Sequence, residues 1–121
     1  MSILKPGEKV HAGLLAAFPG QVRRAFIGVV EAYENGVARV RGRSWLFDAL
    51  QGVYVPKNDE RVRLISVVSG RYVFNVLPPG TDLSKVRYHR RPDGTLVLTD
   101  GGALMMDVSE GDVRRSRGRG T

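Results

Sequence analysis

The sequence predicts an all-β fold: a small, strongly bent barrel followed by a C-terminal β meander. No segment after residue 20 shows apolar side chains recurring with the period of a helix. Short runs rich in Val, Ile and aromatic residues occur instead, separated by Gly, Asn and Pro turn signals. The chain has 121 residues, 42% of them hydrophobic, so we expect one domain with an ordinary apolar core over residues 1–108.

The first 20 residues fit two interpretations. Residues 8–18 suit a short helix ended by Pro19-Gly20, whereas residues 10–15 suit a strand. Gly13 costs a helix about 1 kcal/mol relative to alanine, so we favour the strand.

The barrel is expected over about residues 20–79. Its expected strands are residues 25–33, 37–47, 53–55, 61–68 and 71–77. Asn35-Gly36 is a strong hairpin signal, because both central residues of the favoured two-residue turn need positive φ. Ser69-Gly70 predicts a second tight hairpin between the last two of these strands.

Pro78-Pro79-Gly80 stops the barrel, and residues 81–85 predict one helical turn with Thr81 as its cap. The C-terminal meander, over about residues 86–108, is expected to use strands 86–91, 95–99 and 103–108. Residues 109–121 hold only one apolar side chain, so they are predicted to form a disordered basic tail.

Composition and motifs argue against several classes of protein. The chain has no cysteine, which removes disulfides, thiolate nucleophiles and zinc ribbons. The longest apolar stretch near the start is too short for a secretory signal or a membrane span. We therefore expect a cytoplasmic protein that does not bind membranes.

The residues that usually carry catalysis are sparse. The two histidines, His11 and His89, lie far apart in the sequence, and no nucleophile elbow or metal-ligand spacing occurs. Asp48, Asp100 and Asp107 are interpreted as turn and strand-end aspartates, and Asp100-Gly101-Gly102 as a hairpin turn. The sequence predicts no enzyme, no cofactor and no metal site.

A row of arginines carries the main binding hypothesis. Arg39, Arg41 and Arg43 alternate with small or apolar residues, so they share one face of a strand, with Trp45 next in the row. A two-residue turn at Asn35-Gly36 would place them opposite Ala32, Val30 and Gly28, with Glu31 on the other face. Such a row, unmatched by acids, is free to bind an anion, with Trp45 as a stacking platform. The alternative is an ordinary solvated face.

Two more basic clusters add to this hypothesis. Arg87, His89 and Arg91 share one strand face with Tyr88 on the other, which suits either a phosphate site or an edge strand protected by charge. The tail contributes Arg114, Arg115, Arg117 and Arg119. Arg-Gly segments of this kind contact nucleic-acid backbones.

Two segments resemble the signatures of Sm-like proteins. Residues 46–55 are similar to the first signature, with Asp48 at its acidic position, and residues 67–76 are similar to the second, with Gly70 at its glycine. The resemblance implies a five-stranded barrel over about residues 21–78. Gly52, Ser69 and Leu50 depart from the family at its RNA-contacting positions, so ring-type uridine binding is not implied.

Two functional hypotheses follow. The first is a non-enzymatic barrel that binds RNA or DNA through the arginine row and the tail. The second is a protein-interaction or assembly module, associating with itself or a partner through strand edges and using Trp45, Phe47 and Tyr54. The net charge is +7, but the tail arginines supply four of these charges, so the placement of charge matters more than its sum.

Overall fold

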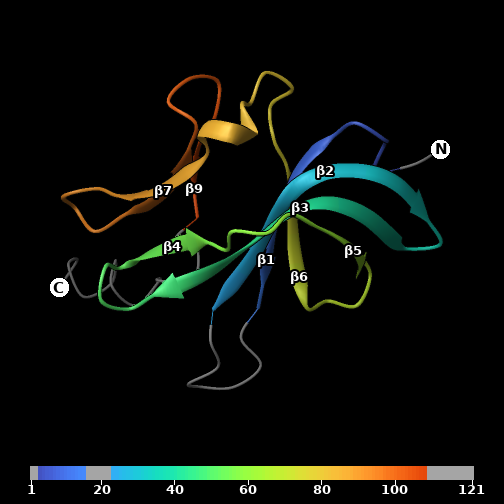
Figure 1. Cartoon of the computed structure of the whole chain (residues 1–121), viewed down its shortest axis with the longest axis horizontal. Helices are drawn as coiled ribbons and strands as arrows, with labels where there is room; N and C mark the ends of the chain where they lie inside the picture. Colours follow the sequence, from blue (N-terminus) through green and yellow to red (C-terminus); the bar gives the residue numbers. More distant parts are fainter. Residues whose placement is uncertain (1–2, 16–22, 109–121) are drawn as a thin grey trace, which may run out of the picture.

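The computed structural model describes residues 3–15 and 23–108, which form two antiparallel β-sheets (Figure 1). The elements are β1 (Lys9–Leu14), β2 (Arg24–Glu34), β3 (Val37–Asp48), β4 (Val53–Pro56), β5 (Arg61–Ser66), β6 (Tyr72–Val76), the 3-10 turn η1 (Leu83–Lys85), β7 (Arg87–Arg90), β8 (Leu96–Thr99) and β9 (Met105–Asp107). The larger sheet has the order β4-β3-β2-β1-β6, and β5 also pairs with β3. The smaller sheet has the order β7-β8-β9. The all-β prediction and the C-terminal meander are confirmed.

The hairpin of β2 and β3 is the centre of the larger sheet. Asn35 and Gly36 adopt φ values of 50° and 79°, so the predicted turn with two positive φ angles is confirmed. β1 pairs with β2 on one side and with β6 on the other, which confirms the strand interpretation of the N-terminal segment. Residues 16–18 of that segment lie outside the described residues.

The larger sheet bends around an apolar cluster that we call the curl core. Phe26 and Val30 of β2 lie on its inner face with Ala38 and Val40 of β3. The full set of buried members is Leu4, Val10, Ala12, Phe26, Val30, Ala38, Val40 and Ile65. These are alternate positions along the strands, so one face of the sheet supplies the cluster.

Two facing glycines let the central strands approach closely. Gly28 and Gly42 are paired across β2 and β3. A Cβ atom on Gly28 would lie 2.1 Å from the carbonyl oxygen of Arg41, and one on Gly42 would lie 2.0 Å from that of Ile27. Any side chain at either position would force the two backbones apart, so the strand geometry depends on glycine here.

A second apolar cluster, the inter-sheet core, joins the two sheets. Trp45 of β3 and Tyr88 of β7 pack with their ring centroids 5.3 Å apart, and Tyr54 of β4 stacks on Tyr88 at 4.6 Å. The buried members are Ala25, Ile27, Trp45, Leu77, Val86, Tyr88, Leu96, Leu98 and Leu104. The meander therefore covers one part of the outer face of the larger sheet and leaves the rest of it open.

The larger sheet does not close into a barrel, which corrects the predicted closure. Within the described residues, β5 pairs with β3 and β6 pairs with β1, so the hairpin predicted across Ser69-Gly70 is wrong. Pairing with β3 places Ile65 opposite Ala38, where it is buried in the curl core. β5 and β6 gain their apolar contacts from different partner strands. The free energy of burying these side chains outweighs the local preference of Ser69-Gly70 for a tight hairpin turn.

The helical turn before the meander also differs from prediction in its cap. The side chain of Asp82 accepts a hydrogen bond from the amide of Ser84 and caps η1. Thr81, the predicted cap, is instead buried, and its hydroxyl has no hydrogen-bond partner among the described residues.

Within residues 3–15 and 23–108, no helix has the length and apolar character needed to cross a membrane.

Candidate functional site

The arginine row lies on the outer face of β3, as predicted. Arg39, Arg41 and Arg43 are exposed, whereas the residues between them, Val40 and Gly42, are buried. The three guanidinium groups therefore share the part of the outer face that the meander leaves open.

The register of the hairpin changes the electrostatics of this row. A β-bulge at Glu31 lies between the pairs Val30–Val40 and Ala32–Arg39. Because of this extra residue, Arg41 faces Val29 and Arg43 faces Ile27, and the predicted pairs with Val30 and Gly28 are wrong.

The bulge also gives the row an acidic partner, which corrects the expectation of unmatched arginines. Glu31 accepts hydrogen bonds from Arg39 Nε at 3.0 Å and from Arg41 Nε at 2.7 Å. These bonds, first from Arg41 and then from Arg39, lower the pKa of Glu31. Arg41 also lies 3.8 Å from a carboxylate oxygen of Glu60. Two of the three arginines are thus partly neutralised.

Arg43 is held by the backbone instead of by a carboxylate. Its Nη1 donates to the carbonyl oxygen of Asn58 at 2.6 Å and to that of Lys57 at 3.3 Å. These bonds keep the full positive charge of Arg43 beside the exposed Lys57 at the connection of β4 and β5.

Trp45 does not lie exposed at the end of the row. Its side chain is only 7% exposed, because Tyr88 and the meander cover it. One part of it still borders a shallow hollow of about 280 Å³ between the larger sheet and η1, which Arg41 and Arg43 also line. Burial removes Trp45 as an open platform on which a base could stack.

The second cluster lies on β7, which forms an edge of the smaller sheet. Arg87, His89 and Arg91 are exposed and Tyr88 is buried, so the predicted division between two faces is confirmed. Arg90 has a structural role, because it donates hydrogen bonds to the carbonyl oxygens of Gly52 and Gly94.

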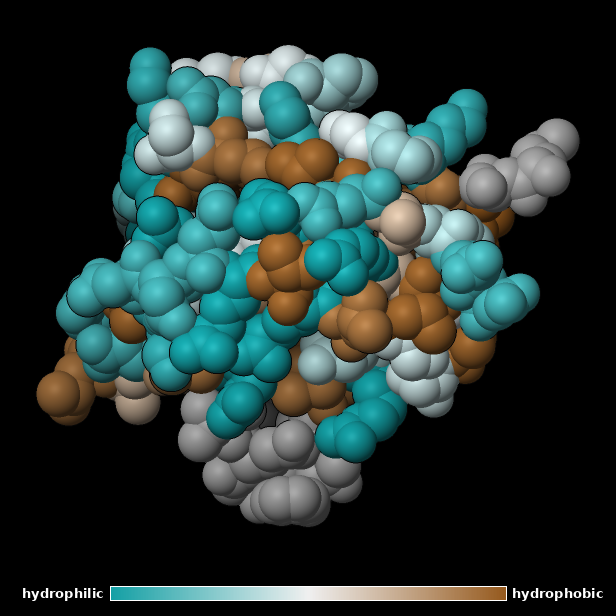
Figure 2. Space-filling view, turned by 45° about the vertical axis from the view of Figure 1, so that its right-hand side comes forward, coloured by the Kyte–Doolittle hydropathy of each residue, from teal (hydrophilic) through white to brown (hydrophobic). Residues whose placement is uncertain are grey.

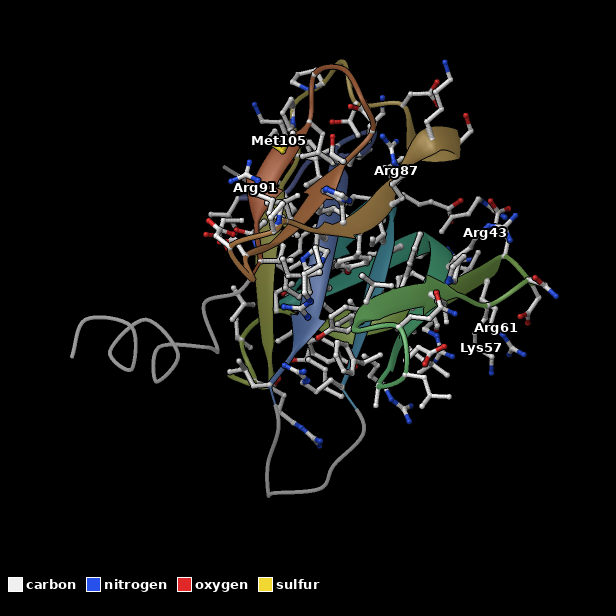
Figure 3. All side chains as sticks on the ribbon, turned by 90° about the vertical axis from the view of Figure 1, so that its left-hand side faces the viewer. Arg43, Lys57, Arg61, Arg87, Arg91 and Met105 are labelled. Carbon is white, nitrogen blue, oxygen red and sulfur yellow. The ribbon has the colours of Figure 1, made fainter. Side chains whose placement is uncertain are left out.

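Together these elements present a set of cations that we call the basic face: Arg43, Lys57, Arg87 and Arg91. Figure 3 shows Arg87 at the start of β7 and Arg91 just after its end, with Arg43 on β3 and Lys57 in the connection between β4 and β5. Within the described part of the chain, none of the four lies within 4.0 Å of a carboxylate oxygen. The neighbouring Arg61, in contrast, pairs with Asp59 at 2.7 Å.

Arg114, Arg115, Arg117 and Arg119 of the predicted basic tail lie outside the described residues, as does the whole segment 109–121. Lys57 was not singled out by the sequence analysis. No strand periodicity identifies it, since it follows the end of β4 in a turn.

Two of the three aspartates interpreted as turn and strand-end residues, Asp48 and Asp100, bind backbone amides. Asp48 accepts hydrogen bonds from the amides of Leu50 and Gln51. Asp100 is buried and accepts from the amides of Asp82, Leu104 and Gly102, and these bonds lower its pKa to about 2. Among the described residues no group of three His, Asp or Glu side chains is placed to hold a metal ion.

One buried polar pair, His11 and Tyr88, has no signal in the sequence. His11 Nε2 lies 2.8 Å from the hydroxyl of Tyr88, although the two residues are 77 positions apart. Only the contact between β1 and β7 brings them together, and no spacing in the sequence could have indicated it.

Comparisons with protein families, with curated proteins and with solved structures gave no match to this chain. The resemblance to Sm-like proteins therefore stays a prediction.

Proposed function

We propose that this chain is a non-enzymatic module that binds the phosphate backbone of RNA or DNA on the basic face. The observation that carries the proposal concerns four exposed cations on the side of the molecule seen in Figure 3, two on or just after β7, one on β3 and one after β4. None of them has a carboxylate partner among the described residues. Arginine and lysine arranged in this way bind phosphates by charge and by hydrogen bonds.

The ion pairs on β3 divide the predicted site into two parts. Arg43 keeps its charge available, whereas Arg39 and Arg41 share Glu31. We therefore assign the main contacts to the basic face and a smaller share to Arg39 and Arg41. The tail arginines would add charge to the same interaction, and Trp45 supports the fold instead of stacking on a base.

The test is the binding of a fluorescent single-stranded RNA and of the same sequence as DNA, measured by anisotropy over a series of salt concentrations. The test variant replaces Arg43, Lys57, Arg87 and Arg91 together by glutamine. Each phosphate contact removed should reduce the slope of log affinity against log salt by about 0.7, as for single strands. We expect a loss of affinity of at least about tenfold at low salt.

A matched control keeps the same type of substitution away from the basic face. Arg71 precedes β6, at the opposite edge of the larger sheet from β4. Arg71→Gln should change affinity by less than about twofold, the effect of one distant charge. The proposal is refuted if neither nucleic acid binds at micromolar protein in low salt. It is also refuted if the quadruple variant binds as tightly as the wild-type chain.

A second candidate, association between copies of this chain, is favoured by the open edges of the larger sheet. β5 and β6 each pair along one edge only within the described residues. Exposed apolar side chains lie on or beside them: Leu64 is 69% exposed, Val68 74% and Val76 51%. Figure 2 shows apolar side chains among hydrophilic ones on this side of the molecule. Exposed edges of this kind favour strand pairing between chains.

Sedimentation velocity over a range of concentrations tests this second candidate. A defined oligomer that Leu64→Lys together with Val76→Lys converts to monomer would support it. A monomer at all concentrations would exclude it, and it would leave the nucleic-acid proposal untouched.

A further inference from the structure

A cavity of about 360 Å³ lies between the larger sheet and β7, away from the basic face. Its lining residues come from five strands and their flanks. Apolar and aromatic side chains form most of the wall, and polar groups are supplied by His11, Arg23, Tyr54, Asn75 and Tyr88. Small-molecule sites have this character, a mainly apolar hollow with a few polar groups that orient the ligand.

The histidine in this wall is incompletely satisfied. His11 is only 6% exposed, and its Nδ1 has no hydrogen-bond partner in the described structure. Burial lowers the pKa of His11 to about 4, against a smaller opposing effect of its own backbone, so the ring is neutral at neutral pH. A buried polar nitrogen without a partner is costly and calls for an explanation, such as strain, a catalytic role or a bound water or ion.

The contact between Tyr88 and His11 allows either tautomer of the ring, and we infer the one in which Tyr88 donates. Burial, and secondarily the nearby Tyr54, raises the pKa of Tyr88 well above 10.0, so its hydroxyl stays protonated. A phenol donates more readily than it accepts, so Tyr88 donates to Nε2 of the neutral His11. The proton of the ring then lies on Nδ1, which makes Nδ1 the unused donor.

His11 and Gly13 both line the cavity, and Nδ1 of His11 is buried in its wall. A Cβ atom on Gly13, which lines the same cavity, would lie 3.4 Å from Cε1 and 4.0 Å from Nδ1 of His11. An acceptor atom placed over Gly13 would therefore be close to the edge that carries the unused donor.

We propose that this cavity binds a small, uncharged and mainly apolar molecule whose carbonyl oxygen accepts a hydrogen bond from Nδ1 of His11. The volume is near the lower end of the range for ligand sites, which limits the ligand to about the size of a substituted benzene. A carboxylate fits less well at Nδ1, because the neutral imidazole cannot compensate a buried negative charge. The guanidinium of Arg23, which also lines the cavity, lies over the ring of Phe47, with its Cζ 4.1 Å from the ring centroid. This site is independent of the proposed nucleic-acid function.

The experiment uses the full chain labelled with ¹⁵N and two probes of equal shape. Acetophenone carries the carbonyl group, and α-methylstyrene carries a CH₂ group in its place. Acetophenone should bind saturably, shift the Nδ1 resonance of His11 and bind about fivefold more tightly than α-methylstyrene, the effect of one neutral hydrogen bond. Imidazole ¹⁵N shifts should also show the proton on Nδ1 in the free protein.

Two glycine variants locate the binding. Gly13→Ala places a methyl group against the ring edge of His11 and should weaken acetophenone binding at least about fivefold by excluding it. Gly80→Ala is the matched control, since its methyl group meets only the Cβ of Ala103 at 3.5 Å, and it should leave binding unchanged.

Several results would overturn the proposal. One is the absence of saturable binding of acetophenone up to its solubility limit, which would mean that water alone occupies the position beside Nδ1. Others are equal affinity for both probes, a proton on Nε2, or undiminished binding by a folded Gly13→Ala variant. The comparison of the two probes uses the unaltered chain, so it decides the matter even if Gly13→Ala fails to fold.

Discussion

Replacing Gly28 or Gly42 by alanine is expected to destabilise this protein far more than a glycine-to-alanine change in a strand usually does. Neither glycine has a positive φ, so the backbone conformation alone would accept alanine. The obstacle is the opposite strand, whose carbonyl oxygens would lie 2.1 Å and 2.0 Å from the new methyl groups.

The loss of stability can be worked out from the distance by which β2 and β3 must move apart to accommodate the new methyl group. Real Cβ contacts are essentially never shorter than 3.0 Å, so β2 and β3 must separate locally by about 1 Å, which breaks neighbouring ladder hydrogen bonds. Each such bond contributes about 1 kcal/mol, and overpacking adds about 1–3 kcal/mol. We therefore expect a loss of about 3–5 kcal/mol in the free energy of unfolding for either variant.

Urea and thermal unfolding measure this loss, with Gly80→Ala as the control. A domain of this size loses about 4 °C in Tm for each kcal/mol, so Gly28→Ala and Gly42→Ala should each lower Tm by more than about 10 °C. Gly80→Ala should shift Tm by only about 2 °C, because its Cβ makes an ordinary contact. If Gly28→Ala and Gly42→Ala unfold within about 2 °C of the wild-type chain, the close approach of β2 and β3 does not require glycine at these positions.

Three further predictions concern titration and turn geometry. The pKa of His11 is 6.5 in the unfolded chain and about 4 in the folded chain. The free energy of unfolding should therefore fall by about 3 kcal/mol as the pH drops from 6.5 to 4, because the unfolded chain binds the proton first. A His11→Phe variant with the same pH dependence would contradict this. Backbone amides hold the pKa of Asp100 at about 2, so the stabilisation that its carboxylate gives is present above pH 3.8 and is lost as the pH falls towards 2. Asp100→Asn should remove this fall in Tm between pH 3.8 and 2. An unchanged fall in Tm would count against the prediction. Asn35→Ala should cost about 1 kcal/mol in urea unfolding, because alanine is strained at positive φ, whereas Asn35→Gly should be nearly neutral.

The sequence alone determined the features that depend on neighbouring residues. Alternation along 37–43 placed Arg39, Arg41 and Arg43 on one face, and Asn35-Gly36 formed the predicted turn. The meander and the turns at Asp48 and Asp100 also follow from local chemistry, whereas the sequence left both a helix and a strand open for residues 8–18. Side-chain period and φ preference act within a few residues, so they can be read from the chain directly.

The tertiary structure alone decided which elements meet. The bulge at Glu31 supplied the acid that Arg39 and Arg41 share, and the packing of β7 buried Trp45 and brought Tyr88 to His11. β5 and β6 each have one unpaired edge within the described residues, because β5 pairs with β3 and β6 pairs with β1 instead of with each other. These outcomes depend on the competition for buried area among segments far apart in sequence, a competition that no local pattern encodes.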